Sequence, residues 1–225
     1  MADEGAEPKP SIAYVDERED ARGDFFSDAF NSELFEDIFV LAPEPTLPEM
    51  LDRLFELRID ALVSDFQLSE AAPVDYDGEK LISAFLDRRA DFPCFIQTSF
   101  DNDALQVAGD VNRVYSKNPK AEAGARQHFF QRINLQIDRH REMIVNWKAE
   151  LADLLVIDRA ELSSAQIDRL IELDTAIERN LGADDPLSKQ AKQELFGDSS
   201  LFNRREQLID ETEKLIQKIK NAIDG

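Results

Sequence analysis

Short apolar runs alternate with amphipathic stretches over the first 119 residues. The runs are typical of strands buried on both faces of a parallel sheet, and they cover residues 11–15, 37–42, 60–64, 94–98 and 113–116. The stretches between them predict helices at residues 24–35, 46–57, 78–89 and 101–110. In the first of these, Phe26, Phe30 and Leu34 form the apolar stripe. Strands that alternate with helices predict an α/β domain with a doubly wound, five-stranded parallel sheet.

The pattern changes after residue 125, where only helical periods follow. Apolar positions spaced by four and three predict a long, coiled-coil-like helix; the seam consists of Ile133, Ile137, His140, Ile144, Trp147, Leu151 and Leu154. A second helix is predicted to start at Ser163 or Ser164 and to end at Leu181, and a third covers residues 201–223. The long helix is also expected to serve as the last helix of the α/β domain.

These patterns divide the chain into three parts. Residues 1–10 are polar and contain proline, which predicts a disordered lead-in. Residues 11–125 form the α/β domain, and residues 126–225 form an α-helical output or assembly module. An isologous homodimer through the long helix is a further expectation.

The chain is strongly acidic, with a formal charge of −21 over 225 residues. About −17 of this precedes Lys120 by residue count, and such a charge disfavours nucleic acid and anionic membranes as partners. The single cysteine, Cys94, excludes an internal disulfide and is expected to be a buried thiol. We see no signal peptide and no apolar run near 20 residues, so we expect a cytoplasmic protein that binds no membrane.

The residues at the predicted strand ends carry the candidate chemistry. Asp16 and Glu17 follow the first strand, Asp65 the third, Thr98 ends the fourth, and Lys117 follows the fifth. The carboxyl ends of parallel strands meet at one edge, so these groups are expected to converge there. Close carboxylates need a cation, and Mg²⁺ suits a shallow site with oxygen ligands. One carboxylate could then attack phosphorus, while Lys117 and Thr98 hold the phosphoryl oxygens.

The first 119 residues resemble the receiver domain of bacterial two-component response regulators, which has a flavodoxin-like fold. The matching segments are "YVDE", "LVSDFQL", "DGEKLI", "PCFIQTS" and "YSKNP". The resemblance implies that Asp65 is the phosphoacceptor. It implies an Mg²⁺ site at Asp16, Glu17, Asp65 and the backbone carbonyl of Gln67, and it gives Thr98 and Lys117 the hydroxyl and lysine roles.

The sequence departs from the receiver pattern near Asp65 and near Lys117. Receivers usually have a proline four residues after the phosphoacceptor, where this chain has Ser69, and a longer loop precedes Gly78. Asn118 separates the lysine from its proline, and the aromatic residue Tyr115 lies two rather than three positions before the lysine. The loop change is expected to affect access of the phosphodonor, and the shift of Tyr115 bears on switching.

The resulting interpretation is a signalling protein that receives a phosphoryl group on Asp65 from a sensor histidine kinase or phosphotransfer protein. It is expected to act on an unknown downstream protein through the helical module, and to show at most autodephosphorylation activity rather than an enzymatic output. A phosphate sink or scaffold is an alternative. Less favoured are an adaptor that is never phosphorylated and a haloacid-dehalogenase-like phosphatase, which would need an acid in place of Gln67. His140 is expected to tune helix pairing rather than to carry phosphate.

Overall fold

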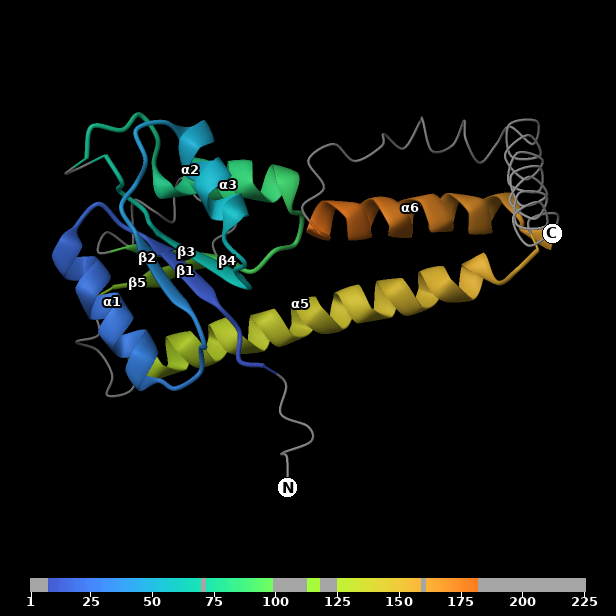
Figure 1. Ribbon diagram of the computed structural model, residues 1–225, viewed down its shortest axis with the longest axis horizontal. Helices are drawn as coiled ribbons and strands as arrows, with labels where there is room; N and C mark the ends of the chain where they lie inside the picture. The colour runs from blue at the N-terminus through green and yellow to red at the C-terminus, as the bar shows by residue number, and fades with distance from the viewer. Residues whose placement is uncertain (1–7, 70–71, 99–112, 118–124, 159–160, 182–225) are drawn as a thin grey trace, which may run out of the picture. The chain divides into compact units, whose positions relative to one another are not determined.

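The computed structural model describes residues 8–69, 72–98, 113–117, 125–158 and 161–181. At its centre is a sheet of five parallel strands in the order β2-β1-β3-β4-β5 (Figure 1). The strands are β1 Ile12–Val15, β2 Ile38–Leu41, β3 Ala61–Asp65, β4 Cys94–Thr98 and β5 Val114–Ser116. Every strand end lies within one residue of its prediction. The strand order is that of the flavodoxin-like class, so the predicted fold is confirmed.

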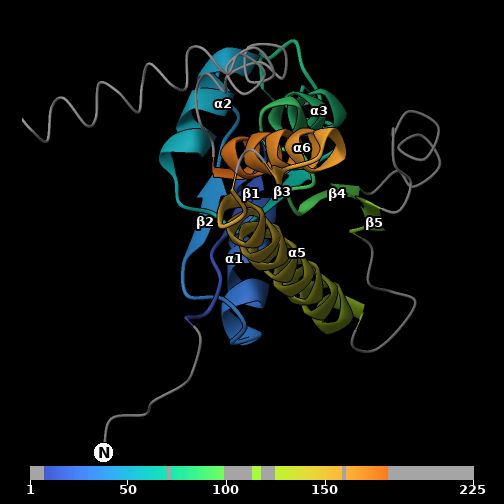
Figure 2. The same cartoon turned by 90° about the vertical axis from the view of Figure 1, so that its right-hand side faces the viewer.

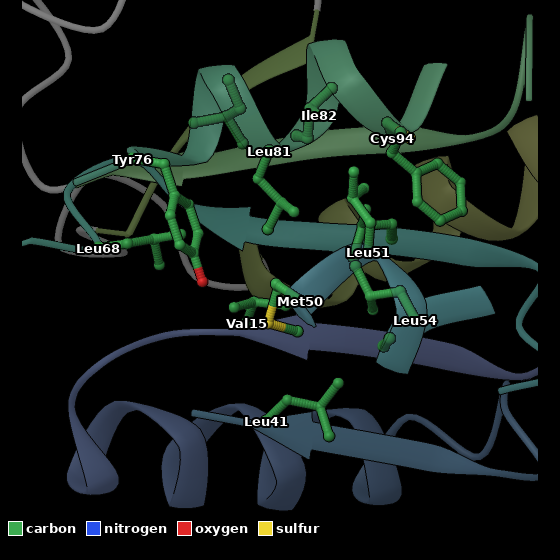
Figure 3. Close-up of a cluster of buried hydrophobic side chains, with 14 of the residues drawn as sticks. Val15, Leu41, Met50, Leu51, Leu54, Leu68, Tyr76, Leu81, Ile82 and Cys94 are labelled. Carbon is green, nitrogen blue, oxygen red and sulfur yellow. The ribbon is translucent and has the colours of Figure 1, made fainter. Parts of the chain in front are cut away.

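Alternate residues of the strands face opposite sides of the sheet and build two cores. Helices α2 and α3 cover one face, and α1 and α5 cover the other (Figure 2). The core under α2 and α3 brings together apolar side chains from both layers (Figure 3), among them Val15, Leu41, Met50, Leu54, Leu68, Leu81 and Cys94. The core under α1 and α5 contains Ile12, Tyr14, Phe25, Val63, Phe95, Phe130 and Ile133. A sheet buried on both faces explains why its strands read as continuous apolar runs.

Helices α2 (Leu47–Glu56) and α3 (Gly78–Arg88) begin at polar caps. The Thr46 hydroxyl accepts a hydrogen bond from the backbone N–H of Glu49, and the Glu49 side chain accepts one from the backbone of Thr46. The Asp77 carboxylate accepts from the backbone N–H of Lys80 at 2.8 Å. Such caps satisfy backbone donors that have no partner within the helix, so they fix where each helix starts.

Helix α1 differs from its prediction. It spans Glu19–Asn31 rather than residues 24–35, and it buries Phe25 and Ala29. Phe26 and Phe30, the predicted core residues, are 44% and 67% exposed. The predicted face was therefore wrong. The adjacent pair Phe25-Phe26 allows two helical phases, and the core selects Phe25 because its ring stacks on Tyr14 at 4.1 Å.

Helix α5 (Ala125–Leu155) completes the second core, as predicted. Its side chains Ile133 and Ile137 are buried against the sheet. Arg141 donates hydrogen bonds to the Asp60 carboxylate, which also accepts the Ser11 backbone N–H at 2.9 Å. These contacts join α5 to the chain just before β1 and β3.

The described residues divide into two compact units. The first runs to Asn146 and takes in Arg179–Leu181, while the second spans Trp147–Glu178. In the second unit, Arg169 of α6 (Ser164–Leu181) donates two hydrogen bonds to Glu150 of α5, at 2.8 and 2.7 Å. Helix α6 starts where predicted, and Ser163 pairs reciprocally with Gln166 at its N-terminus.

The predicted helices at residues 101–110 and 201–223, and the lead-in before residue 8, lie outside the described residues. Among the helices that the structure describes, none is both long and apolar enough to cross a membrane. Cys94 is buried, as expected, and burial raises the pKa of its thiol to about 12.

Candidate active site

The candidate site lies at the carboxyl ends of β1 and β3. The two strands pair in parallel with Val15 beside Ser64, so the next residues, Asp16 and Asp65, emerge side by side. The chain leaves β1 for β2 on one side of this position, whereas β3 lies on the other side. This is the point where the strand order reverses, and crevices at that point hold the ligands of open α/β sheets.

Three carboxylates converge there. Asp16, Glu17 and Asp65 each offer an oxygen, and these atoms all lie within 4.8 Å of one another. The Asp16 and Asp65 residues are buried, with 0% and 6% exposure. Lys117 reaches them from the end of β5: its Nζ lies 2.6 Å from Asp16 Oδ2 and forms an ion pair with Asp65. The structure thus brings together four of the residues that the sequence places at the strand ends.

Every oxygen of the Asp16 carboxylate has a fixed donor. Its Oδ1 accepts the backbone N–H of Arg18 at 2.8 Å. Its Oδ2 accepts the Tyr14 hydroxyl at 2.5 Å in addition to Lys117. Burial and the neighbouring Asp16 carboxylate hold the pKa of the Tyr14 phenol above its usual value, so the hydroxyl remains a donor. These donors fix the orientation of the buried carboxylate.

Tyr14 is a site residue that was not predicted from the sequence. Its signal was present in "YVDE", because residues two apart on a strand point to the same side. Tyr14 and Asp16 are such a pair, and a phenol beside a carboxylate is a ready hydrogen-bond donor.

Asp65 is held from three directions. Its Oδ2 accepts the backbone N–H of Gln67 at 2.8 Å, and Lys117 pairs with its other oxygen. Its backbone carbonyl accepts the Ser64 hydroxyl at 2.9 Å. Burial raises the pKa of Asp65, while the Lys117 ammonium opposes that rise.

Gly78 packs directly against the backbone of Asp65. A Cβ at this position would lie 1.9 Å from the Asp65 carbonyl oxygen, so only glycine fits. The Gly78 backbone N–H also donates to the carbonyl of Phe66 at 2.9 Å. The longer loop after Ser69 therefore still brings a glycine to the back of the candidate phosphoacceptor. Tyr76 closes that loop by donating to the Glu44 carbonyl at 2.7 Å.

Glu17 shows the clearest need for a ligand. Its Oε2 is buried and accepts no hydrogen bond from any residue that the structure describes. Burial raises the pKa of Glu17 to about 7, and the nearby Asp16 and Asp65 carboxylates add to the rise. A buried acceptor without a donor is costly, and a cation at this oxygen would remove that cost. The three carboxylates therefore fit a hard divalent cation such as Mg²⁺.

Thr98 and Gln67 lie where the sequence places them. Thr98 ends β4 with 1% exposure, and its carbonyl accepts the Lys117 backbone N–H at 2.7 Å. Gln67 follows Asp65 by two residues and contributes the backbone N–H described above. The phosphoryl-binding role of Thr98 and the metal-ligand role of Gln67 remain predictions. Asn118 and Pro119 lie outside the described residues.

Tyr115, the displaced aromatic residue, is half-buried in the second core. Its ring packs at 5.0 Å from Phe129 and 5.8 Å from Phe95, and the Arg132 guanidinium lies 5.8 Å from its centre. The ring therefore contacts both β4 and α5, so movement of either element would change its packing.

His140 is a packed residue of α5. It is 8% exposed, its Nε2 lies 2.8 Å from Asn180 Oδ1, and its ring meets Phe92 edge-on at 5.6 Å. Burial lowers the pKa of this imidazole. The position agrees with a role in helix packing, because Nε2 is engaged by Asn180 and the ring packs on Phe92.

Comparisons with known proteins find similar structures but no similar sequence. No protein-family model matches the sequence, and no curated protein matches it either. The structure is similar to a two-component transcriptional regulator from Clostridium phytofermentans, with 14% identity, a TM-score of 0.47, and coverage of 59% of this chain and 98% of that one. It is also similar to a response regulator receiver domain from Clostridium thermocellum, with 16% identity, a TM-score of 0.44, and coverage of 60% and 98%.

A third similar structure is the RcsB response regulator of Salmonella typhimurium, with 14% identity, a TM-score of 0.43, and coverage of 81% of this chain and 97% of that one. The sheet gives the fold independently of these scores, because its strand order is 2-1-3-4-5 and its acidic cluster lies at the point of reversal. The α/β part of this chain thus has the fold of the receiver domain of response regulators.

Proposed function

We propose that the chain is a response-regulator-type signalling protein that accepts a phosphoryl group on Asp65. The observation that carries the proposal is the placement of Asp65 beside Asp16, Glu17 and the Lys117 ammonium at one edge of the sheet. A cation held by these carboxylates would supply positive charge that offsets theirs and that of an incoming phosphoryl group. Asp16, Glu17, Asp65 and the Gln67 carbonyl are its proposed ligands.

The transfer needs one bond made and one bond broken. A carboxylate oxygen of Asp65 attacks phosphorus, and the bond from phosphorus to the donor breaks as its electron pair leaves with the donor group. With a phosphohistidine donor, that group is an imidazole that takes a proton from water. The Lys117 ammonium turns from the carboxylates to a phosphoryl oxygen, while the Thr98 hydroxyl donates to another.

A mass measurement tests the proposal. Incubation with acetyl phosphate and Mg²⁺ is expected to add about 80 Da, the mass of one phosphoryl group. Asp65→Asn should abolish the gain, while Asp52→Asn, an exposed carboxylate on α2, should leave it unchanged. A gain that survives Asp65→Asn would contradict the assignment. Failure of the wild-type chain with several donors would favour the adaptor that is never phosphorylated.

We propose that residues 126–225 form the output module. Phosphorylation adds charge beside β1 and β3, and α5 packs on the face of the sheet formed by Ile12 and Val63 of these strands. A change in this packing would reach the module through α5 and bias binding of a partner protein or formation of a homodimer. Sedimentation with and without beryllofluoride measures the second outcome. A strict monomer in both states would exclude the homodimer.

A phosphate sink is the alternative function. In that case the kinase or phosphotransfer partner would lose its phosphoryl groups to Asp65, but neither assembly nor partner affinity would change on phosphorylation. The RcsB structure was described in terms of DNA interaction. We do not extend that to this chain, because a formal charge of −21 opposes binding to phosphates.

A further inference from the structure

We infer that the Tyr14 hydroxyl is a positioning group for the divalent-cation site, and this inference rests on the proposed function. Tyr14 OH lies 2.5 Å from Asp16 Oδ2, and the two residues are 1% and 0% exposed. A donor held this close in a dry environment fixes the plane of the carboxylate. Such partners of metal ligands set the direction of the ligand's lone pairs.

Packing, rather than the hydrogen bond, holds the Tyr14 ring in place. The ring stacks on Phe25 of α1 with centroids 4.1 Å apart and an angle of 11° between the planes. Phe25 is itself packed edge-on against Phe130 of α5 at 5.4 Å. The ring is thus clamped between the sheet and the helices that cover it. Its hydroxyl points at Asp16 before any ligand arrives, so the alignment costs nothing when a cation binds.

The other partners of Asp16 differ in how easily they can leave. Arg18 donates through its backbone N–H to Oδ1 and is fixed by the start of α1. Lys117 donates to Oδ2 from a long side chain that is 20% exposed. When Lys117 turns to a phosphoryl oxygen, one lone pair of Asp16 Oδ2 becomes free to bind the cation. The Tyr14 hydroxyl still donates to the other lone pair of Oδ2, so the free lone pair has a fixed orientation.

Tyr76 provides a matched control. It is 2% exposed, and its hydroxyl also donates a hydrogen bond, which is partly buried, to the Glu44 carbonyl at 2.7 Å. It lies in the other core, under α2 and α3 (Figure 3). Replacing either tyrosine by phenylalanine removes one hydroxyl and keeps the ring. A purely structural role of Tyr14 would make the two variants behave alike.

The test compares Mg²⁺ binding by calorimetry in the wild-type chain, Tyr14→Phe and Tyr76→Phe. Tyr14→Phe removes the positioning donor and is expected to lower the affinity for Mg²⁺ about tenfold or more. This is the usual size of the effect when a hydrogen-bond partner of a metal ligand is lost. Tyr76→Phe should match the wild type. The ultraviolet difference spectrum of tyrosine on Mg²⁺ addition should vanish in Tyr14→Phe alone. At saturating Mg²⁺, the Tyr14→Phe variant should again be phosphorylated by acetyl phosphate.

A second variant keeps the hydroxyl and loosens its support. Phe25→Leu removes the stacked ring, and its affinity for Mg²⁺ is expected to lie between those of the wild type and Tyr14→Phe. If the wild type binds no Mg²⁺ and accepts no phosphoryl group, the proposed function fails. If the wild type does both, and Tyr14→Phe and Phe25→Leu bind Mg²⁺ as tightly as Tyr76→Phe, the positioning role is wrong. Thermal unfolding of each variant identifies any change that is due to misfolding.

Discussion

Lys117 Nζ lies 2.6 Å from Asp16 Oδ2, although the two residues are 101 positions apart in the sequence. The same ammonium pairs with Asp65, so one cation of the chain serves two buried carboxylates. Any metal ion that binds these acids must share them with Lys117 or displace it. Metal binding and movement of the lysine are therefore coupled.

Replacement of this lysine is the first prediction. Lys117→Ala leaves two buried carboxylates without their ammonium, and breaking a buried pair in this way costs about 3–5 kcal/mol. We expect a lower melting temperature without Mg²⁺, recovery on Mg²⁺ addition, tighter Mg²⁺ binding and a loss of phosphorylation of at least about tenfold. Calorimetry and phosphorylation assays measure these effects. Lys80→Ala, which removes an exposed contact to the Asp75 carbonyl, should change none of them.

The second prediction concerns pH and Glu17. Its pKa is raised to about 7 in the folded protein by burial, so Mg²⁺ must displace a proton at lower pH. We expect the apparent Mg²⁺ affinity to fall about tenfold per pH unit below that value. Glu17→Gln should weaken the binding and flatten this dependence. An equally steep dependence in Glu17→Gln would assign the proton to another group.

The same raised pKa has a consequence for stability without metal. Between the ordinary pKa of a glutamate and about 7, the folded chain holds a proton that the unfolded chain has lost. The contribution of Glu17 to the free energy of unfolding is therefore fully present below the ordinary pKa and is lost as the pH rises through about 7. Asp65, whose pKa is also raised, acts in the same direction. Thermal unfolding across this range should show Mg²⁺ protecting most at the upper end.

Gly78 gives the third prediction. In Gly78→Ala the added Cβ would lie 1.9 Å from the Asp65 carbonyl oxygen, so the start of α3 or the candidate phosphoacceptor has to move. We expect a loss of stability of several kcal/mol, about 3 or more, together with loss of phosphorylation.

Gly23 supplies the control for this substitution. It lies in the middle of α1, and a Cβ there would meet nothing within 4 Å. Gly23→Ala should stabilise the chain by about 0.5–1 kcal/mol through helix propensity. Equal effects of the two alanines in chemical denaturation would show that the contact at Gly78 is unimportant.

Two phenylalanines of α1, one buried and one exposed, give the fourth prediction. Phe25→Ala removes a buried ring and is expected to cost about 3–5 kcal/mol. Phe30→Ala removes a ring that is 67% exposed and should cost less than about 1 kcal/mol. Urea denaturation of both variants measures the difference. A larger loss of stability in Phe30→Ala than in Phe25→Ala would show that the predicted face, with Phe26 and Phe30, is the buried one.

The sequence was informative wherever one pattern dominated. Strands buried on both faces leave an unbroken apolar run, so all five were placed within one residue. The seam of α5 was visible because its residues repeat over several turns. Ser163 marked the start of α6 because serine caps helices well.

The sequence was uninformative where the outcome depends on partners far along the chain. Nothing near Phe25 and Phe26 says which ring meets Phe130, which is 105 positions from Phe25. The start of α1 was missed because Arg18 at its N-cap makes no side-chain capping bond. The strand ends implied that Lys117 approaches the acids, but only the folded structure shows that its ammonium pairs with both Asp16 and Asp65.

Cys94 makes the chain convenient for site-specific labelling. Its thiol is buried in the core, and a pKa of about 12 leaves almost none of it as the reactive thiolate at neutral pH. It is also the only cysteine of the 225 residues. A cysteine introduced at Val156, which is 85% exposed, would take up a maleimide dye alone. A fluorophore there could follow the helical module in real time while Asp65 is loaded and discharged.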